Sequence, residues 1–173
     1  MSAAPGRRVV IADAGPLIAL ARIDALALLP GLFGRVYITA TVREEVLPGT
    51  AAFPDAAVLA RALQEGWLEV VDAPPSAFKP LNPGVDAGEA SAIHTACAWR
   101  DAGDAVLLVM DDRAGRLEAR AHGLALIGTA GVIGLAKTEG LITAARPVLQ
   151  RLAGVGYYLG RAVMDAVLAN LGE

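Results

Sequence analysis

The fold is decided by residues 105–113, which read Ala-Val-Leu-Leu-Val-Met-Asp-Asp-Arg. The unbroken apolar run from Ala105 to Met110 is typical of a central strand in a parallel sheet, because such a strand is buried on both faces. Two carboxylates, Asp111 and Asp112, follow directly at its carboxyl end. Open α/β sheets bind their ligands at this end of the strands. The stretch therefore predicts a buried strand that brings acids to one edge of a sheet.

Similar apolar runs alternate with helical patterns along the rest of the chain. This alternation is typical of βαβ units and favours a three-layer α/β/α fold with a mostly parallel central sheet. We expect strands at residues 9–12, 36–38, 68–71, 105–110 and 125–127. We expect helices at residues 16–23, 55–65, 87–100, 129–139, 143–153 and 159–171, and further helices beginning near residue 41 and after residue 112. Residues 72–85 contain four prolines and form the one clear loop.

The composition supports a single domain over residues 1–173. A chain of 173 residues that is 55% hydrophobic can bury a core and is too apolar to be disordered. We expect the core at about residues 9–142, with helices in residues 143–173 packed on it. The single cysteine, Cys97, cannot form an internal disulfide and favours a reducing compartment. Because no run of about 18 apolar residues occurs, we expect a cytoplasmic protein without a membrane partner.

The net charge of the chain excludes one class of nucleic-acid-binding protein and permits another. A net charge of -3 does not fit a protein that coats nucleic acid, since such proteins are basic. It permits a nuclease in which metal ions offset a local cluster of acids. Arg113, Arg116 and Arg120 lie on one predicted helix, where they would orient an RNA backbone or receive an acidic segment of a partner.

Acidic residues also follow the first two predicted strands. Asp13 comes directly after the first strand; its structural alternative is a helix N-cap, although Gly15 is the better cap position. Glu44 and Glu45 follow the second strand. Thr41 and Glu44 have the spacing of a capping box, so Glu45 is the better candidate to face the sheet edge. A solvated glutamate is the alternative for Glu45.

Glu89 and the Asp111–Asp112 pair allow both a structural and a chemical interpretation. Asp86 and Glu89 have capping-box spacing, which gives Glu89 a structural alternative. Asp111 and Asp112 repel one another unless a cation or an arginine lies between them. Side chains at a strand end alternate between faces. We therefore expect Asp111 to be the ligand and Asp112 to begin the next helix, paired with Arg116 four residues on.

These junctions lie on one edge of a parallel sheet, so the acids are expected to converge. Several carboxylates cannot share a small pocket without a cation. Oxygen ligands favour Mg²⁺ or Mn²⁺, and such ions support phosphodiester hydrolysis. The predicted catalytic residues are Asp13, Glu45, Glu89, Asp111 and Asp112, with Asp13, Glu45, Glu89 and Asp111 as the metal ligands.

The ordered landmarks resemble those of the PIN-domain family, in a branch of predicted nucleic-acid-binding proteins. They are Asp13–Ile18, Val42–Val46, Asp86–Ala90, Met110–Arg113, and Gly128–Gly134 with Ala136-Lys137. The resemblance runs from Val9 to about Ile142 and more loosely to Glu173. It implies a metal-dependent ribonuclease, in many cases a toxin that a small protein neutralises. It assigns metal-ligand roles to Asp13, Glu45, Glu89 and one of Asp111 or Asp112.

Two residues depart from the usual pattern of that family. Gly15 stands where a serine or threonine is frequent, and Glu89 stands where an aspartate is usual. These changes leave open an inactive PIN-like module that only binds RNA or protein. A receiver-type phosphoacceptor needs its acid pair after the first strand and a single aspartate later. This chain has the single Asp13 first and the Asp111–Asp112 pair later, which excludes that class.

The expected function is therefore a Mg²⁺- or Mn²⁺-dependent endoribonuclease. Its expected partners are an RNA substrate and a small antitoxin-type protein, as in a toxin–antitoxin pair. Part of the apolar face of the C-terminal helices is a candidate homodimer surface.

Overall fold

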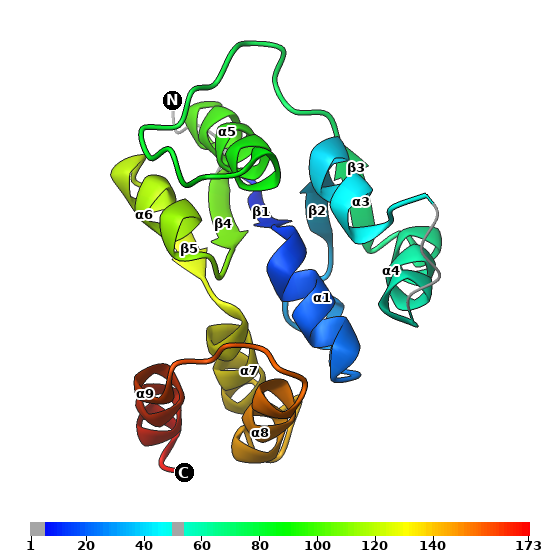
Figure 1. Cartoon of the computed structure of the whole chain (residues 1–173), viewed down its shortest axis with the longest axis vertical. Coiled ribbons are helices and arrows are strands. Elements are labelled where there is room, and N and C mark those ends of the chain that lie inside the picture. The colour runs from blue at the N-terminus through cyan, green and yellow to red at the C-terminus, as the bar shows by residue number, and fades with distance from the viewer. Residues whose placement is uncertain (1–5, 50–53) are drawn as a thin grey trace.

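The structure, a computed structural model, describes residues 6–49 and 54–173. Its centre is one sheet of parallel strands in the order β3-β2-β1-β4-β5. The strands are β1 (Arg8–Ala12), β2 (Val36–Thr39), β3 (Leu68–Val71), β4 (Ala105–Val109) and β5 (Ala125–Ile127). Helices cover both faces (Figure 1), so the expected three-layer α/β/α fold is confirmed.

The helices lie close to the ranges expected from the sequence. They are α1 (Ala14–Arg22), α2 (Leu28–Phe33), α3 (Ala40–Val46), α4 (Pro54–Glu65), α5 (Ala87–Asp101), α6 (Arg113–Ala121), α7 (Thr129–Thr138), α8 (Arg146–Gly154) and α9 (Arg161–Leu171). The short helix α2 was not expected, because Pro30 and Gly31 interrupt its pattern. None of the described helices is both long and apolar enough to cross a membrane.

Alternation along the two central strands builds a core on each face of the sheet. Val9 and Ile11 of β1 pack with Ile93 of α5, in the cluster that also contains Ala119 of α6. Val10 lies in the opposite cluster, which contains residues of α1, α7 and α8. Because successive side chains of a strand point to opposite faces, a continuous apolar run is needed to fill both cores. This requirement explains why residues 9–12 of β1 and all of β4 are hydrophobic.

The strand order reverses direction between β1 and β4. From β1 the chain builds outward through β2 and β3, and then returns to place β4 on the other side of β1. The residues after the two strands lie level with one another, since Ala12 pairs with Val109 and the Asp13 N–H donates to the Val109 carbonyl at 3.0 Å. Such a switch point opens a crevice at the carboxyl ends of the strands. Asp13 and the Asp111–Asp112 pair flank it.

The C-terminal helices pack against α7, as Figure 1 shows. At Gly134 of α7 an added Cβ would lie 3.1 Å from Val167 of α9, so the glycine permits a close approach. The Glu173 carboxylate accepts hydrogen bonds from the N–H groups of Ala145 and Arg146, at 2.8 and 3.0 Å. The last side chain of the sequence thus caps the start of α8.

Candidate functional site at the carboxyl edge of the sheet

Asp13 lies at the switch point and is 6% exposed. Helix α1 begins at Ala14, so Asp13 occupies the N-cap position and the expectation of a cap at Gly15 is wrong. The Asp13 side chain makes no capping hydrogen bond. Burial raises its pKa to about 7; the nearby N–H groups of Ala14 and Gly15 oppose the rise, and the charges of Asp86 and Glu45 add to it. Asp13 is therefore a buried carboxyl, and among the residues that the structure describes no basic side chain forms an ion pair with it.

Glu45 projects from α3 toward the start of α5. The expected Thr41–Glu44 capping box is not formed, because the helix begins earlier: Thr39 is its N-cap and accepts from the Val42 N–H at 3.2 Å. The Glu45 carboxylate reaches Gly88, where an added Cβ would lie 2.4 Å from its Oε1. Burial and the charge of Asp86 raise the Glu45 pKa, and the Gly88 N–H lowers it. Gly88 thus provides the space that Glu45 needs.

Glu89 is buried, at 4% exposure, in the first turn of α5. The expected capping box is present: the Glu89 N–H donates to Asp86 at 2.8 Å, and the Asp86 N–H donates to Glu89 Oε2 at 3.1 Å. Burial raises the Glu89 pKa to about 7; the Asp86 N–H lowers it, and the charges of Asp86, Asp112 and Asp13 raise it further. Capping uses one carboxylate oxygen, so Glu89 serves as a helix cap and faces the other acids at the same time.

The two adjacent aspartates after β4 point to different partners. Asp112 caps α6 by accepting from Ala114 and Gly115 N–H, at 2.6 and 3.2 Å, and its charge acts on Glu89. Asp111 accepts instead from the N–H of Thr129, at 2.8 Å, and from its hydroxyl. Asp112 begins the helix as expected. The geometry differs from the expectation about the ligand: the charge of Asp112, and not that of Asp111, acts on Glu89 of α5.

The three arginines of α6 do not form one equivalent group. Arg113 and Arg120 are exposed. Arg116 is half-buried and donates to the Met110 carbonyl at 2.8 Å, so it fastens α6 to the end of β4. The expected ion pair between Asp112 and Arg116 is not formed. Of these three arginines, Arg113 and Arg120 are therefore the ones exposed enough to meet a nucleic-acid backbone.

Several residues that support the site were not singled out from the sequence. The Ser91 hydroxyl donates to the Gly88 carbonyl at 2.7 Å and lies 2.6 Å from the Thr39 hydroxyl, which joins the starts of α3 and α5. At Gly115 an added Cβ would lie 3.1 Å from the carboxyl carbon of Glu89. The Tyr157 hydroxyl interacts with Asp111, and burial together with that carboxylate raises the Tyr157 pKa above its usual value. Small residues in helix starts are the signal that would have found Gly88 and Gly115.

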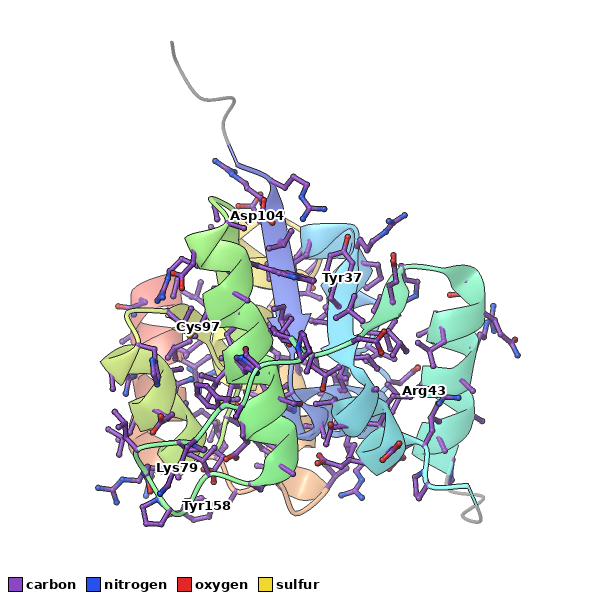
Figure 2. The ribbon with its side chains drawn as sticks, turned by 90° about the horizontal axis from the view of Figure 1, so that it is seen from above. Tyr37, Arg43, Lys79, Cys97, Asp104 and Tyr158 are labelled. Carbon is purple, nitrogen blue, oxygen red and sulfur yellow. The ribbon has the colours of Figure 1, made fainter. Side chains whose placement is uncertain are left out.

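The structure thus brings Asp13, Glu45, Glu89 and Asp112 to one edge and turns Asp111 toward α7. Within the described residues, none of these acids forms an ion pair with a basic side chain. In residues 6–49 and 54–173, no three acidic, histidine or cysteine side chains stand close enough to hold a metal ion as they are. Figure 2 shows Arg43, Lys79 and Tyr158 on the side of the molecule away from Asp104, which precedes β4 at the opposite edge.

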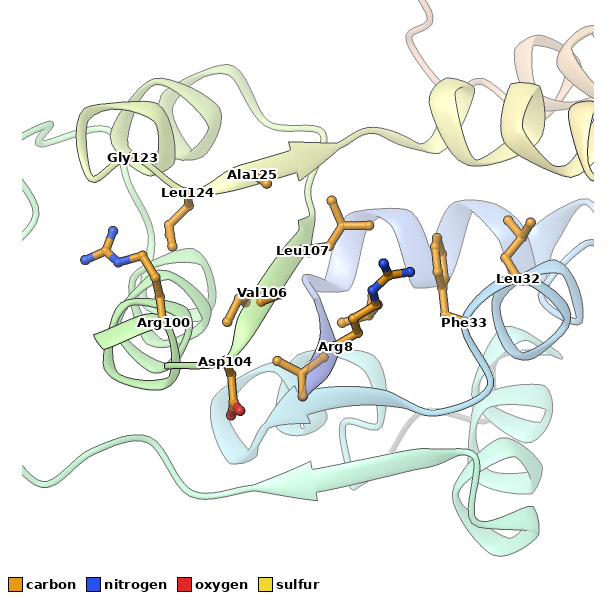
Figure 3. A pocket seen from close by; sticks show the side chains of 13 residues that line it. Arg8, Leu32, Phe33, Arg100, Asp104, Val106, Leu107, Gly123, Leu124 and Ala125 are labelled. Atoms are coloured by element: carbon orange, nitrogen blue, oxygen red, sulfur yellow. The ribbon is translucent and has the colours of Figure 1, made fainter. Parts of the chain in front are cut away.

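A pocket of about 650 Å³ lies at that opposite edge, where β1, β4 and β5 begin (Figure 3). Its wall is mainly apolar and includes Leu107 and Phe33. Two of its charged residues have partners: Asp104 pairs with Arg7 at 2.8 Å and Arg100 pairs with Asp101 at 2.8 Å. The carboxylate in its lining, Asp104, is already compensated by Arg7, and its other charged lining residues are the arginines Arg8 and Arg100. The acidic edge is therefore the candidate functional site.

The fold and this edge define a parallel α/β domain with a carboxylate site at the switch point of its sheet. A sequence model of a family, described as a PIN domain, matches residues 9–173. The chain therefore belongs to the PIN-domain family, which has a nuclease-type fold. A search of curated protein sequences gives no match to the chain.

Proposed function

We propose that the chain is a Mg²⁺- or Mn²⁺-dependent endoribonuclease whose metal ligands are Asp13, Glu45, Glu89 and Asp112. The observation that supports this most strongly is the burial of two carboxyls, Asp13 and Glu89, at the same edge of the sheet; burial raises the pKa of each to about 7. Ionised carboxyls in such surroundings are costly without a counter-charge. A divalent cation supplies that charge, and an oxygen-only donor set suits a hard ion.

The residues present fit such an ion by their chemistry and their freedom to move. Glu45 is exposed at the rim, so its side chain can adjust toward the buried Asp13 and Glu89. Each capped helix start also fixes one carboxylate: Glu89 by the capping box and Asp112 by the N–H groups of Ala114 and Gly115. A bound divalent ion supplies Lewis acidity to a phosphodiester oxygen and to water.

The chain's own residues would contribute orientation and charge. Asp13 and Glu89 form the buried floor of the site, while Glu45 on α3 and Asp112 on α6 approach from two sides. The exposed Arg113 lies directly after Asp112 at the start of α6, where it can contact a backbone phosphate. RNA is then held with a phosphodiester over the carboxylates.

Cleavage of a single-stranded RNA tests the activity. We expect cleavage with Mn²⁺ or Mg²⁺, none with excess chelator, and cleavage slower by about 100-fold or more with Asp13→Asn protein. A single-stranded DNA of the same sequence distinguishes a ribonuclease from a general nuclease. RNA binding without cleavage in every metal would favour the inactive binding module instead.

The proposal extends to a toxin with a small protein partner. Beside the acidic edge, Leu117 of α6 is 48% exposed between the exposed Arg113 and Arg120, and Leu81 is 76% exposed. Exposed leucines flanked by arginines suit a partner with apolar and acidic side chains. Induced expression in bacterial cells should stop growth with the wild-type chain and not with Asp13→Asn. Equal growth of both would contradict the toxin role and leave the nuclease activity to the cleavage assay.

A further inference from the structure

The loop between β3 and α5, residues 72–85, is fastened to α6 by one buried side chain. Glu118 is 2% exposed. Its carboxylate accepts from the Leu81 N–H and the Asn82 N–H, each at 2.9 Å. His122 Nε2 lies 3.0 Å from the same carboxylate. Burial tends to raise the Glu118 pKa, but these partners outweigh it and the pKa lies below its usual value. We call this arrangement of Glu118, Leu81, Asn82 and His122 the Glu118 clamp.

A second set of contacts holds the same loop against both helices. The Phe78 ring stacks on His94 of α5, with centroids 5.1 Å apart, and lies 5.5 Å from the ring of His122. The Ser76 hydroxyl lies 3.1 Å from His94 Nε2. Figure 1 shows the loop passing from β3 around α5 to the side of α6. Both histidines are thus occupied in holding the loop.

A short turn connects the Glu118 clamp to the acids of α5. Asn82 Oδ1 accepts from the Gly84 N–H at 2.9 Å, and the Asn82 carbonyl accepts from the Val85 N–H at 3.2 Å. An added Cβ on Gly84 would lie 3.3 Å from Ala114 in the first turn of α6. The next residue after Val85 is Asp86, the N-cap of α5 that forms the capping box with Glu89. These contacts hold the turn in place, so the Glu118 clamp is connected closely to Asp86 and Glu89 of the candidate site.

Glu118 lies on α6, and the N-cap residue of this helix, Asp112, is one of the acids of the candidate site. Glu118 lies about 9 Å along α6 from Asp112, at 1.5 Å per residue. The clamp therefore braces two helix starts against one another: that of α5, with Glu89, and that of α6, with Asp112. The Asp112 charge already acts on Glu89, so a change in their separation alters the site directly.

We propose that Glu118 is a positioning residue for the carboxylate site: by holding Leu81 and Asn82 against α6, it sets the distance between Glu89 and Asp112. This inference rests on the proposed function for its effect on metal binding. The effect of Glu118 on the spacing of Glu89 and Asp112 concerns the metal-free protein and does not depend on the proposed function.

Glu118→Gln tests the clamp, because the amide keeps one acceptor and must set an NH₂ against a backbone N–H. We expect amide hydrogen exchange at Leu81 or Asn82 to accelerate at least about 10-fold, with shifted amide resonances at Asp86 and Glu89 in metal-free protein. The manganese concentration that half-saturates the rise in Tm should increase about 10-fold, as for other residues that orient metal ligands. Saturating manganese should restore most of the cleavage rate.

Two further variants keep the test decisive. Glu139→Gln removes the same charge from an exposed position and should change none of these quantities. Asn82→Ala breaks the turn without altering the core, and should raise the manganese midpoint in the same direction even if Glu118→Gln fails to fold.

The outcomes separate the clamp from the proposed function. Faster exchange at Leu81 or Asn82 with unchanged Asp86 and Glu89 resonances and an unchanged manganese midpoint would overturn the positioning role. Absence of any manganese effect in wild type would contradict the proposed metal site; the Asp86 and Glu89 resonances of the metal-free variants would then decide on the clamp alone.

Discussion

Two buried glutamates on neighbouring helices of this molecule differ in the donors around them. Glu118 of α6 is 2% exposed and Glu89 of α5 is 4% exposed. Glu118 has two backbone N–H donors and His122, and its pKa is lowered. Glu89 has one backbone donor, three acidic neighbours and a pKa raised to about 7. Burial is the largest cause of the raised Glu89 pKa, and the three acidic neighbours add to it, whereas at Glu118 the hydrogen-bond donors outweigh the effect of burial.

The comparison shows which carboxylate is structural and which is available for chemistry. A carboxylate whose charge is already compensated by donors stabilises the fold and has little to offer a cation. A buried carboxylate surrounded by other acids is destabilising in its ionised form, and binding a cation relieves that cost. Perturbed pKa values at a cleft are typical of functional sites for this reason.

The largest expected effect is a loss of RNA cleavage on replacement of Asp13, and the same replacement should increase the stability of the metal-free protein. Asp13→Asn should lower RNA cleavage by about 100-fold or more, because a buried ligand is lost. The same change should raise the Tm of the metal-free protein at pH 8, because a buried charge is removed. Cleavage kinetics and thermal melts measure the two effects. Retention of activity in a folded Asp13→Asn protein would remove Asp13 from the site.

The two aspartates after β4 provide a matched pair of substitutions. Asn can replace either residue and keep its hydrogen bonds, since its oxygen accepts and its NH₂ donates. Asp112→Asn should lower cleavage at least about 10-fold, whereas Asp111→Asn should change it little; both should keep the wild-type Tm within a few degrees. The reverse order of activities would restore Asp111 as the ligand.

Gly88→Ala tests whether Glu45 belongs to the edge. The new Cβ would meet the Glu45 carboxylate at about 2.4 Å and displace it. We expect cleavage to fall about 10-fold with little change in the free energy of unfolding, since alanine favours the helix. Gly154→Ala is the control, because its Cβ meets nothing within 4 Å. Unchanged cleavage in Gly88→Ala would show that Glu45 is not needed in this position.

The free energy of unfolding of the metal-free protein should change with pH in opposite directions at the acidic edge and at Glu118. Asp13 has an ordinary pKa of 3.8 and a folded pKa of about 7, so the folded state holds a proton that the unfolded state has lost. The free energy of unfolding should therefore fall as pH rises from about 4 to 7, by about 2–4 kcal/mol for Asp13. Denaturant melts should show a smaller slope in Asp13→Asn.

The contribution of Glu118 to stability changes at a lower pH than that of Asp13. Its pKa is lowered in the folded state, so its contribution is present above its unfolded pKa and is lost as pH falls below it. A Glu118→Gln protein should keep the wild-type slope between pH 4 and 7. Loss of that slope in Glu118→Gln would contradict the assignment of the pH dependence to the acidic edge.

The smallest expected effect concerns the arginines of α6. Arg113→Ala and Arg120→Ala should each weaken RNA binding a few-fold and reduce the salt slope by about 1, with manganese binding unchanged. Arg116→Ala should lower stability instead, because it loses the bond to the Met110 carbonyl. Filter binding over a salt series and thermal melts distinguish the two classes. Equal effects of all three would mean that α6 presents one uniform basic face.

The sequence predicted the sheet and most helices because hydrophobic periodicity and turn residues are local signals. It also placed acids at the carboxyl edge, since strand-to-helix junctions of a parallel sheet lie together. The orientation of Asp111 was not predictable, because it depends on Thr129, eighteen residues away. The Glu118 clamp was missed for the same reason: the backbone N–H groups that Glu118 binds lie 36 and 37 residues away in a loop.

The most direct test of the central claim is the anomalous manganese density in crystals of the wild-type chain grown with Mn²⁺. We expect a peak at the carboxyl edge, within bonding distance of Asp13, Glu89 and Asp112, with Glu45 drawn toward it and Asp111 still bound to Thr129. A peak coordinated by Asp111 in place of Asp112, or none at this edge in fully soaked crystals, would contradict it.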